Sequence, residues 1–360
     1  MTNFRVLIVL PDLPLSGAAT RTVHLARQLV VKGDEVTLLV LRDRIADSLA
    51  RRLAADGVHV STPSRRHLRS WPLPSRRGER PALVHAAMPT AGLAGLAIAR
   101  RRGLPLVYSV TNSLHIDRPF RRESPRDRLK IVLEHHLIER ADALHAVSAG
   151  IAAQIVRRYP GARPRVHTIV HPPTEPLSDP HPVPVPAAAT PRLLCIGRLV
   201  DHKRVADAIE ATALLRTTHP SVHLAVLGTG PLLPELRSLI DARRLTGHVT
   251  IVGESTNPAG WFDWSDVLVH PSIYEGYPRV VAEAISYGVP IVCTCSAGAP
   301  TDEGVQHARP LDPAALRAAV LRAIRSGRTP YREQVEIGEP RLRHLYRLVT
   351  GTQTRIHRPP

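Results

Sequence analysis

Short apolar runs alternate with helix-like segments along the chain, and this alternation constrains the fold more than any other feature of the sequence. It is typical of βαβ units, whose strands pair in parallel sheets with helices on both faces. The pattern occurs in two series, which are separated by a segment with eight prolines between Pro172 and Pro191. A chain of 360 residues is also too long for one hydrophobic core. The sequence therefore predicts two doubly wound α/β domains.

The expected strands are short and mostly apolar. In the first series they cover residues 4–10, 35–41, 82–85, 106–110, 143–147 and 166–170, with a helix at 20–32. In the second series strands are expected at 193–196, 222–227, 249–252, 267–270 and 291–294, and helices at 205–217, 233–243, 280–287 and 313–325. We divide the chain into a first domain (1–175), a semi-rigid linker (176–191), a second domain (192–328) and a tail (329–360) whose helix returns to the first domain.

The net charge of +17 is carried almost entirely by arginine, because the chain has only three lysines, Lys32, Lys130 and Lys203. An excess of arginine, alanine and proline is what a GC-rich coding sequence produces, so the charge alone is weak evidence for a polyanionic partner. Nucleic-acid-binding modules interleave basic residues with exposed aromatic ones, and only 4% of this chain is aromatic. We expect no nucleic-acid partner.

The cysteines and the apolar segments indicate the cellular compartment. The three cysteines lie in strand-like runs, and Cys293 and Cys295 are too close in sequence for an ordinary disulfide, which favours a reducing cytoplasm. The apolar run at residues 6–10 is too short for a signal sequence. No segment approaches the roughly 18 apolar residues of a membrane span, so none is expected.

The most informative motif is residues 275–283, which has a glutamate at each end. It connects the expected strand 267–270 to the expected helix 280–287, so Glu275 lies in a loop and Glu283 about one turn into the helix. Two carboxylates beside an exposed helix N-terminus can hold a sugar hydroxyl and a ribose while the helix end faces phosphate oxygens. The alternative is a solvated loop residue and an ordinary acid on a helix face.

A second motif, residues 195–204, runs from a strand end through a tight loop into a helix. Arg198 and Lys203 lie five residues apart in it, and both can reach a diphosphate. A lysine at this place, in a chain that otherwise uses arginine, favours a specific role as a flexible point charge on phosphate. The alternative is a pair of solvated bases, or pairing with Asp201 inside the loop.

These motifs resemble those of family 4 glycosyltransferases of the GT-B fold. The chain matches their E-x7-E motif, the run from Glu283 to Val292, and the G-R-L-x-x-x-K motif that begins at Gly197. The resemblance covers nearly the whole chain and implies an α/β, GT-B fold, with two doubly wound Rossmann-like domains facing across a cleft. It further implies that Arg198 and Lys203 neutralise the pyrophosphate of the donor, that Glu275 steadies the sugar, and that the anomeric configuration is retained.

Backbone contacts to the donor are expected from five further residues. They are Gly17 after the first strand, Gly228 in a G-x-G-P turn, Gly253 after the strand at 249–252, and Gly276 with Tyr277 inside the E-x7-E motif. Gly228 has an alternative role in a turn that needs a positive φ. Many family members have Phe-Gly-Leu where this chain has Tyr277-Pro278-Arg279, and Pro278 cannot donate a backbone hydrogen bond.

His115 is the nearest candidate for the histidine with which the family often contacts the donor sugar or the acceptor, because Thr111 or Asn112 occupies the usual position. A surface or core histidine is the alternative. The sequence has no Asp-x-Asp motif and no cluster with metal-ligand spacing, so we predict catalysis without a metal and without a cofactor.

The sequence thus predicts transfer of a hexose-type sugar from a UDP- or GDP-linked donor to an acceptor hydroxyl, on a lipid-linked glycan or a small metabolite. Two arginine clusters, residues 61–80 and 118–128, either attach the protein to the anionic inner face of a membrane or form solvated loops. Alternatives are a GT-B-fold epimerase or phosphorylase, which needs no acceptor, and a basic scaffold that binds membranes or polyanions. The sequence does not identify the sugar, the base or the acceptor.

Overall fold

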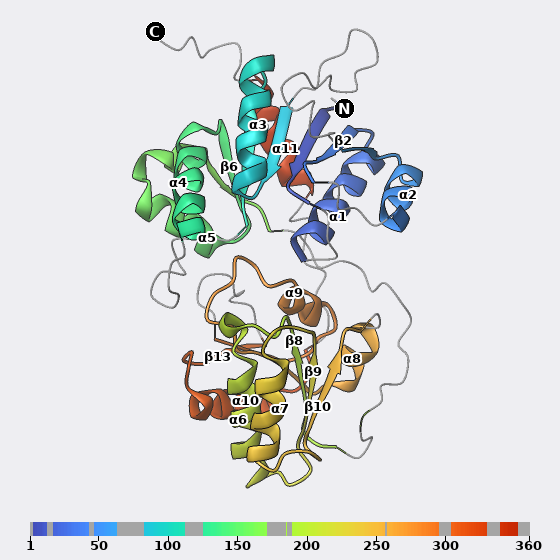
Figure 1. The fold of residues 1–360 in the computed structure, drawn as a ribbon, viewed down its shortest axis with the longest axis vertical. Helices are drawn as coiled ribbons and strands as arrows, with labels where there is room; N and C mark the ends of the chain where they lie inside the picture. Colours follow the sequence, from blue (N-terminus) through green and yellow to red (C-terminus); the bar gives the residue numbers. More distant parts are fainter. Residues whose placement is uncertain are drawn as a thin grey trace. The chain divides into compact units, whose positions relative to one another are not determined.

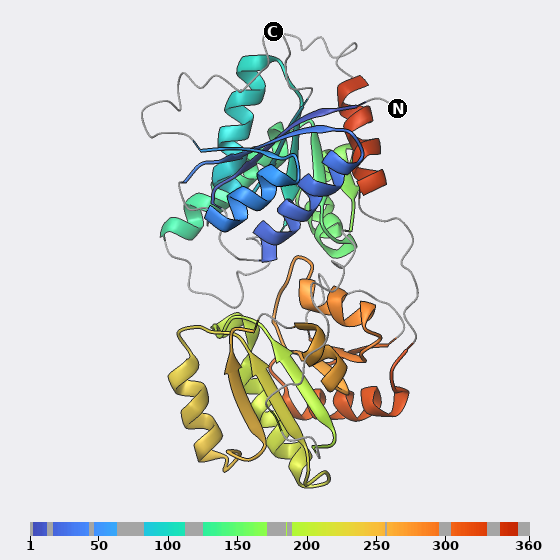
Figure 2. The ribbon, with the colours of Figure 1, turned by 90° about the vertical axis from the view of Figure 1, so that its right-hand side faces the viewer.

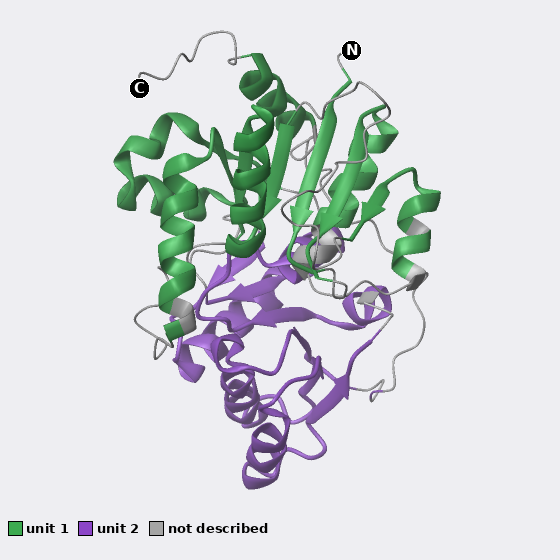
Figure 3. Cartoon of the chain, turned by 45° about the horizontal axis from the view of Figure 1, so that its top comes forward, with its two compact units in different colours: residues 1–172, 335–360 green, residues 173–334 purple. Residues whose placement is uncertain are grey.

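The computed structural model describes residues 3–12, 17–42, 47–62, 83–111, 125–170, 185, 189–255, 258–294, 304–329 and 339–351. The chain divides into two compact units (Figure 3). The first unit consists of Met1–Pro172 and Val335–Pro360, and the second of Pro173–Gln334. Most of the proline-rich linker, and most of both arginine clusters, lie outside the described residues.

The first unit is a seven-stranded parallel sheet with helices around it (Figure 1). Its strands are β1 (Arg5–Leu10), β2 (Glu35–Val40), β3 (His59–Ser61), β4 (Leu83–Ala87), β5 (Leu106–Val110), β6 (Ala143–Ala146) and β7 (Val166–Thr168). Its helices are α1 (Gly17–Val31), α2 (Asp47–Ala55), α3 (Pro89–Arg102), α4 (Pro125–Arg140), α5 (Ala149–Arg158), the 3-10 helix η2 (Pro160–Arg165) and α11 (Glu339–Gly351). The strand order is β3-β2-β1-β4-β5-β6-β7.

The second unit is a six-stranded parallel sheet with the order β10-β9-β8-β11-β12-β13. Its strands are β8 (Arg192–Ile196), β9 (His223–Leu227), β10 (Val249–Gly253), β11 (Val267–His270), β12 (Ile291–Cys293) and β13 (Val305–His307). Its helices are the 3-10 helix η3 (Asp201–Lys203), α6 (Val205–Arg216), α7 (Leu233–Ala242), α8 (Pro258–Trp264), α9 (Arg279–Ser286) and α10 (Pro313–Ser326). Both units are therefore parallel α/β domains, and the predicted fold class is confirmed.

Both faces of the second sheet are covered, which explains why its strands read as nearly continuous apolar runs. Leu193 and Cys195 of β8 pack on one face with buried residues of α6, α7 and α10. Leu194, between them, points to the other face and packs with Trp261 of α8 and Val281 of α9. The turned view in Figure 2 shows helices on both sides of this sheet.

The C-terminal helix α11 belongs to the core of the first unit. Leu342, Leu345 and Tyr346 are buried in the same cluster as residues of β1 and α1. Arg343 pairs with the buried Asp34 at 3.2 Å, and its guanidinium lies 5.7 Å from the ring centre of Phe4. Figure 1 shows α11 next to β1 and α1.

A buried hydrogen-bond chain crosses the first sheet. His145 Nε2 lies 2.9 Å from the carbonyl of Ile169, so this nitrogen donates and the Nδ1 of His145 must accept from Ser109, 2.7 Å away. Ser109 in turn accepts from Nε2 of His85 at 2.6 Å, which leaves Nδ1 of His85 to accept from the hydroxyl of Tyr346, also at 2.6 Å. The chain of bonds thus ties α11 to three strands, and it requires both imidazoles to be neutral.

This arrangement makes the first unit sensitive to acid. Burial, with a smaller contribution from His145, lowers the pKa of His85 to about 3. The unfolded chain therefore takes up a proton below about pH 6.5 while the folded one does not, and the stabilisation is lost between that pH and about 3. We expect the free energy of unfolding to fall by about 2 kcal/mol from this residue between pH 7.5 and pH 5.

The measurement is denaturant unfolding at the two pH values. His85→Asn should flatten the pH dependence, whereas replacing His59, an exposed histidine of β3 in the same unit, should leave it as in the wild type. Equal slopes for wild type and His85→Asn would contradict the assignment.

Candidate functional site

The candidate site lies at the carboxyl ends of β8 and β11, two neighbouring strands in the middle of the second sheet. The strand order reverses between them, since β9 and β10 follow β8 on one side while β12 and β13 follow β11 on the other. In doubly wound sheets, ligands bind outside the carboxyl ends of the strands at this switch point. The loops that leave β8 and β11 carry Arg198, Lys203 and Glu275.

These two loops are attached to each other. The backbone N–H of Ile273 donates to the carbonyl of His202 at 2.9 Å. The rings of His202 and Tyr274 stack, with centres 4.7 Å apart and planes 12° from parallel. The Thr294 hydroxyl, after β12, donates to the carbonyl of Ser272 at 2.7 Å. The residues next to His202 and Tyr274, Lys203 and Glu275, are thereby held facing each other.

Lys203 and Glu275 form an ion pair in which Nζ donates to Oε1. The two side chains are only 19% and 16% exposed. Nε2 of His270, the last residue of β11, lies 3.3 Å from the same oxygen. The structure therefore brings together a cation, a carboxylate and an imidazole, of which only the first two were predicted from the sequence.

The pKa values of Glu275 and His270 are both shifted from their ordinary values. Burial alone raises the pKa of Glu275, but the hydrogen bond with His270 and the charge of Lys203 outweigh it, and the pKa lies well below its ordinary value. Burial lowers the pKa of His270, against the opposing effect of Glu275 and with a further lowering by Lys203. The resting site thus holds an ionised Glu275, paired with Lys203, beside a neutral His270.

The basic residues of the loop after β8 differ in their ion-pair partners. Lys203 pairs with Glu275 and not with Asp201, the partner considered from the sequence. Arg204 pairs with Asp207 at 2.7 Å. The side chain of Arg198 is exposed and makes no ion pair or hydrogen bond with any residue that the structure describes. Arg198 is therefore available to an anionic ligand, whereas Lys203 is already engaged by Glu275.

Helix α9 carries the second glutamate of the motif. Oε1 of Glu283 lies 2.9 Å from Nε of Arg279, and the Glu283 side chain is 13% exposed. The helix starts after Pro278 at the N-cap, which provides no side-chain hydrogen bond to the first turn. The first turn of α9 thus remains a candidate for contacts with phosphate oxygens.

The predicted glycines differ in what the structure requires of them. Gly228 has φ +137°, and a Cβ there would lie 2.0 Å from the carbonyl oxygen of Gly197. Gly228 therefore lets the turn after β9 pack directly on the loop after β8, the structural role considered for it. Gly253 has φ +87° at the irregular end of β10, and a Cβ there would meet no atom within 4 Å.

Gly228→Ala is expected to destabilise the second unit by about 3 kcal/mol or more, because both the backbone conformation and the close approach exclude a side chain. Gly247→Ala is the matched control, since its Cβ would meet no atom within 4 Å. Denaturant unfolding can be followed by the fluorescence of Trp261 and Trp264, which lie in the second unit. Equal stability of the two variants would contradict the role given to Gly228.

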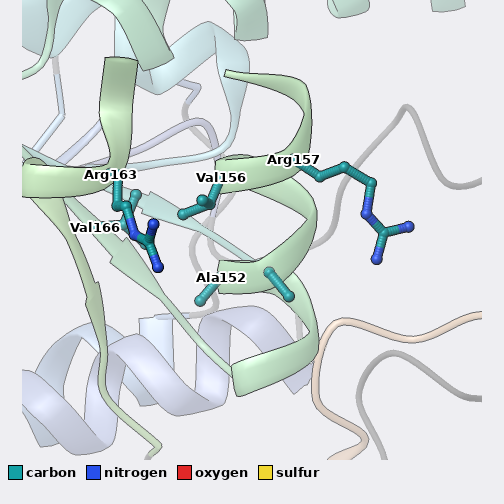
Figure 4. Close-up of a pocket in the computed structure, with 6 residues that line it drawn as sticks. Ala152, Val156, Arg157, Arg163 and Val166 are labelled. Carbon is teal, nitrogen blue, oxygen red and sulfur yellow. The ribbon is translucent and has the colours of Figure 1, made fainter. Parts of the chain in front are cut away.

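Two predicted residues belong to the first unit. Gly17 is the first residue of α1, and His115 lies outside the described residues. A surface depression of about 570 Å³ in this unit is lined by Ala152, Ala153, Val156, Arg157, Arg163 and Val166. Figure 4 shows Arg157 pointing away from the other labelled side chains. The depression holds no predicted site residue and no acid or nucleophile, so we assign it no function.

In the described part of the chain, no group of three or more His, Cys, Asp or Glu side chains is placed to hold a metal ion. Likewise, no described helix is both long and apolar enough to span a bilayer.

Two family models match the chain. Residues 16–173 match the glycosyl transferase 4-like domain, and residues 190–326 match the glycosyl transferases group 1. Among curated relatives, the D-inositol 3-phosphate glycosyltransferase of Arthrobacter sp. (strain FB24) is 32% identical over 228 residues, which are 59% of this chain and 54% of that protein. The chain thus spans about half the length of the curated relatives it matches.

Solved structures agree with this result at the level of the fold. The Anabaena protein Alr3699/HepE in complex with UDP and glucose matches with a TM-score of 0.70 and 16% identity over 98% of this chain and 95% of that one. Sucrose-phosphate synthase of Thermosynechococcus elongatus matches with a TM-score of 0.70 and 20% identity, over 97% and 96% of the two chains. The chain therefore carries a domain that matches the 4-like glycosyl transferases, followed by one that matches the group 1 glycosyl transferases, and its fold is that of the solved structures.

Proposed function

We propose that the chain transfers a hexose-type sugar from a nucleoside diphosphate sugar to an acceptor hydroxyl, and that the donor binds at the carboxyl ends of β8 and β11. One observation carries the proposal: the loops of this switch point hold the Lys203–Glu275 pair together with Arg198, an exposed arginine that has no ion pair with any described residue. Two basic residues on one loop suit a diphosphate, and an adjacent carboxylate suits sugar hydroxyls.

The proposed role of the bases is to stabilise the leaving group. As the bond between the sugar and the diphosphate breaks, negative charge grows on the phosphate oxygens. Arg198, Lys203 and the N–H groups of the first turn of α9 provide positive charge and donors for it. Fixed cations of this kind replace a divalent metal, so the proposed reaction does not depend on one.

The carboxylates orient the rest of the donor. Glu275 accepts from hydroxyls of the sugar once Lys203 has turned to the diphosphate, and Glu283 accepts from the ribose. Backbone groups of Gly276 and Tyr277 contact the sugar, and those of Gly228 and Gly253 lie toward the nucleotide. The acceptor oxygen bonds to the anomeric carbon on the face from which the diphosphate departs, and the departing phosphate takes the proton of the acceptor hydroxyl. The anomeric configuration is retained because the new bond forms on the same face as the broken one.

The relatives support the substrate class. One carries the name D-inositol 3-phosphate glycosyltransferase, and one solved neighbour holds UDP and glucose. The donor of this chain is accordingly proposed to be UDP- or GDP-linked, and the acceptor to be a lipid-linked glycan or a small metabolite. Contact with an anionic membrane surface in the cytoplasm, through the arginine clusters, and a contact of Gly17 or His115 with the reacting groups are further parts of the proposal.

A panel of UDP-, GDP- and ADP-linked sugars tests the proposal. The protein should release nucleoside diphosphate from at least one of them in the presence of a chelator, and faster when acceptor candidates are added. Release of sugar phosphate or of an epimer without an acceptor would favour the epimerase or phosphorylase instead. Binding of polyanions with no response to any nucleotide sugar would favour the scaffold.

A further inference from the structure

His270 lies beside the Lys203–Glu275 pair, and neither the motifs nor the proposed function gives it a role. It is the last residue of β11 and is 2% exposed. Its backbone is fixed in the sheet, because the carbonyl accepts from the N–H of Thr294 at 3.2 Å. A polar ring at this depth, beside a functional carboxylate, calls for a partner.

Nε2 of His270 makes only a long and poorly aligned hydrogen bond with Glu275 in the resting site. This nitrogen is buried and lies 3.3 Å from Oε1 of Glu275, and no residue that the structure describes gives it a well-aligned partner. The groups that face it are Lys203 from η3, Glu275 from the loop after β11, and Cys293, its neighbour in register on β12.

Arrival of a diphosphate changes the balance of these charges. In the resting site the positive charge of Lys203 offsets Glu275 and disfavours a second cation on His270. When Lys203 turns to a diphosphate, its charge is neutralised by the phosphates and Glu275 loses its partner. A buried carboxylate without a partner is costly, and Nε2 of His270 lies 3.3 Å from its Oε1.

We propose that binding of a diphosphate to Lys203 is coupled to uptake of one proton by His270, which replaces Lys203 as the cationic partner of Glu275. The proton comes from the solvent, so the pocket gains one positive charge to balance the anion. His270 is then a positioning residue, which keeps Glu275 ionised and oriented toward the sugar. This inference rests on the proposed donor site.

Calorimetric titration with UDP tests the coupling. Heats measured in two buffers of different ionisation enthalpy give the number of protons taken up, in wild type and in His270→Asn. The terminal phosphate of UDP itself has a pKa near 6, so the difference between the two proteins is the readout. We expect the wild type to take up about half a proton more at pH 7, and to gain roughly three- to tenfold more affinity between pH 8 and pH 6.

His223→Asn is the matched control. His223 is another buried histidine of the second unit, whose pKa is lowered by burial, but it lies at the start of β9 and contacts Thr250. This variant should keep the proton uptake of the wild type. His270→Gln serves in place of His270→Asn if thermal unfolding shows that the asparagine variant does not fold.

The outcomes separate the inference from the proposed function. Equal proton uptake by wild type and the His270 variant, or loss of uptake in His223→Asn as well, would overturn the role of His270 while leaving the donor site intact. Failure of the folded wild type to bind either UDP or GDP would instead remove the proposed function, and the coupling with it.

Discussion

Lys203→Met is expected to weaken UDP binding by ten- to a hundredfold and to abolish donor turnover. Hydrogen bonds to charged groups contribute about 1.5–3 kcal/mol, and the lysine loses its charge in this variant but keeps most of its apolar stem. The effect should exceed that of a surface charge, because the Lys203 side chain is only 19% exposed and is held opposite Glu275. Calorimetry with UDP and a release assay with nucleotide sugars measure the two losses.

Arg243→Met is the matched control for this variant. Arg243 is a cation of the same unit and pairs with Glu210 at 2.8 Å, but its side chain is 54% exposed. It should bind UDP within about twofold of the wild type, since exposed ion pairs contribute little. Similar losses in the two variants would mean that net charge, and not a site at Lys203, accounts for the binding.

Glu275→Gln is expected to have the opposite effect on binding. In the resting site Lys203 is engaged by Glu275, so removing the carboxylate charge frees Lys203 for the diphosphate. UDP affinity should therefore stay the same or increase, by up to about tenfold. Turnover should nevertheless fall by roughly 10²–10³, because the amide orients the sugar poorly and carries no charge for the transition state.

The prediction is specific because UDP affinity and turnover are expected to change in different directions. Glu210→Gln, which removes the partner of Arg243, should change neither quantity. If Glu275→Gln bound UDP as weakly as Lys203→Met does, the Lys203–Glu275 ion pair would stabilise the two loops that form the site. Glu275 would then not compete with UDP for Lys203. Circular dichroism and thermal unfolding identify a variant that fails only because it does not fold.

Much of the second domain could be predicted from the sequence. The boundaries expected for the strand at residues 267–270 agree with β11, and those of the helices at 205–217, 233–243 and 280–287 agree with α6, α7 and α9 to within a residue at each end. These segments have strong apolar patterns and clear end signals, such as Pro278 before α9 and Gly288 after it. Weak patterns were missed, as in β13 with only three residues and α8 with seven.

The pairing inside the site could not be predicted in the same way. Lys203 and Glu275 are 72 residues apart, and they meet because β11 lies directly beside β8 in the sheet. Spacing along the chain does not reveal strand order, so the two residues were assigned to different parts of a ligand and not to each other. His270 was recognised as a strand end, but its proximity to Glu275 depends on the path of the loop between them.

The buried chain from Tyr346 to Ile169 was missed for a related reason. Each of the three strands has one polar residue in an apolar run: His85, Ser109 and His145. From the sequence of one strand, a buried polar residue cannot be distinguished from one that ends the strand or faces solvent. They become partners only when β4, β5 and β6 lie next to one another and α11 closes over them.

A structure of the protein with bound UDP would show which group Lys203 contacts when a diphosphate is present. We expect Nζ of Lys203 to have left Glu275 for the diphosphate oxygens, Arg198 to contact the same group, and Nε2 of His270 to donate to Glu275. A nucleotide bound elsewhere, or bound here with the Lys203–Glu275 pair intact and no contact from either base, would contradict it.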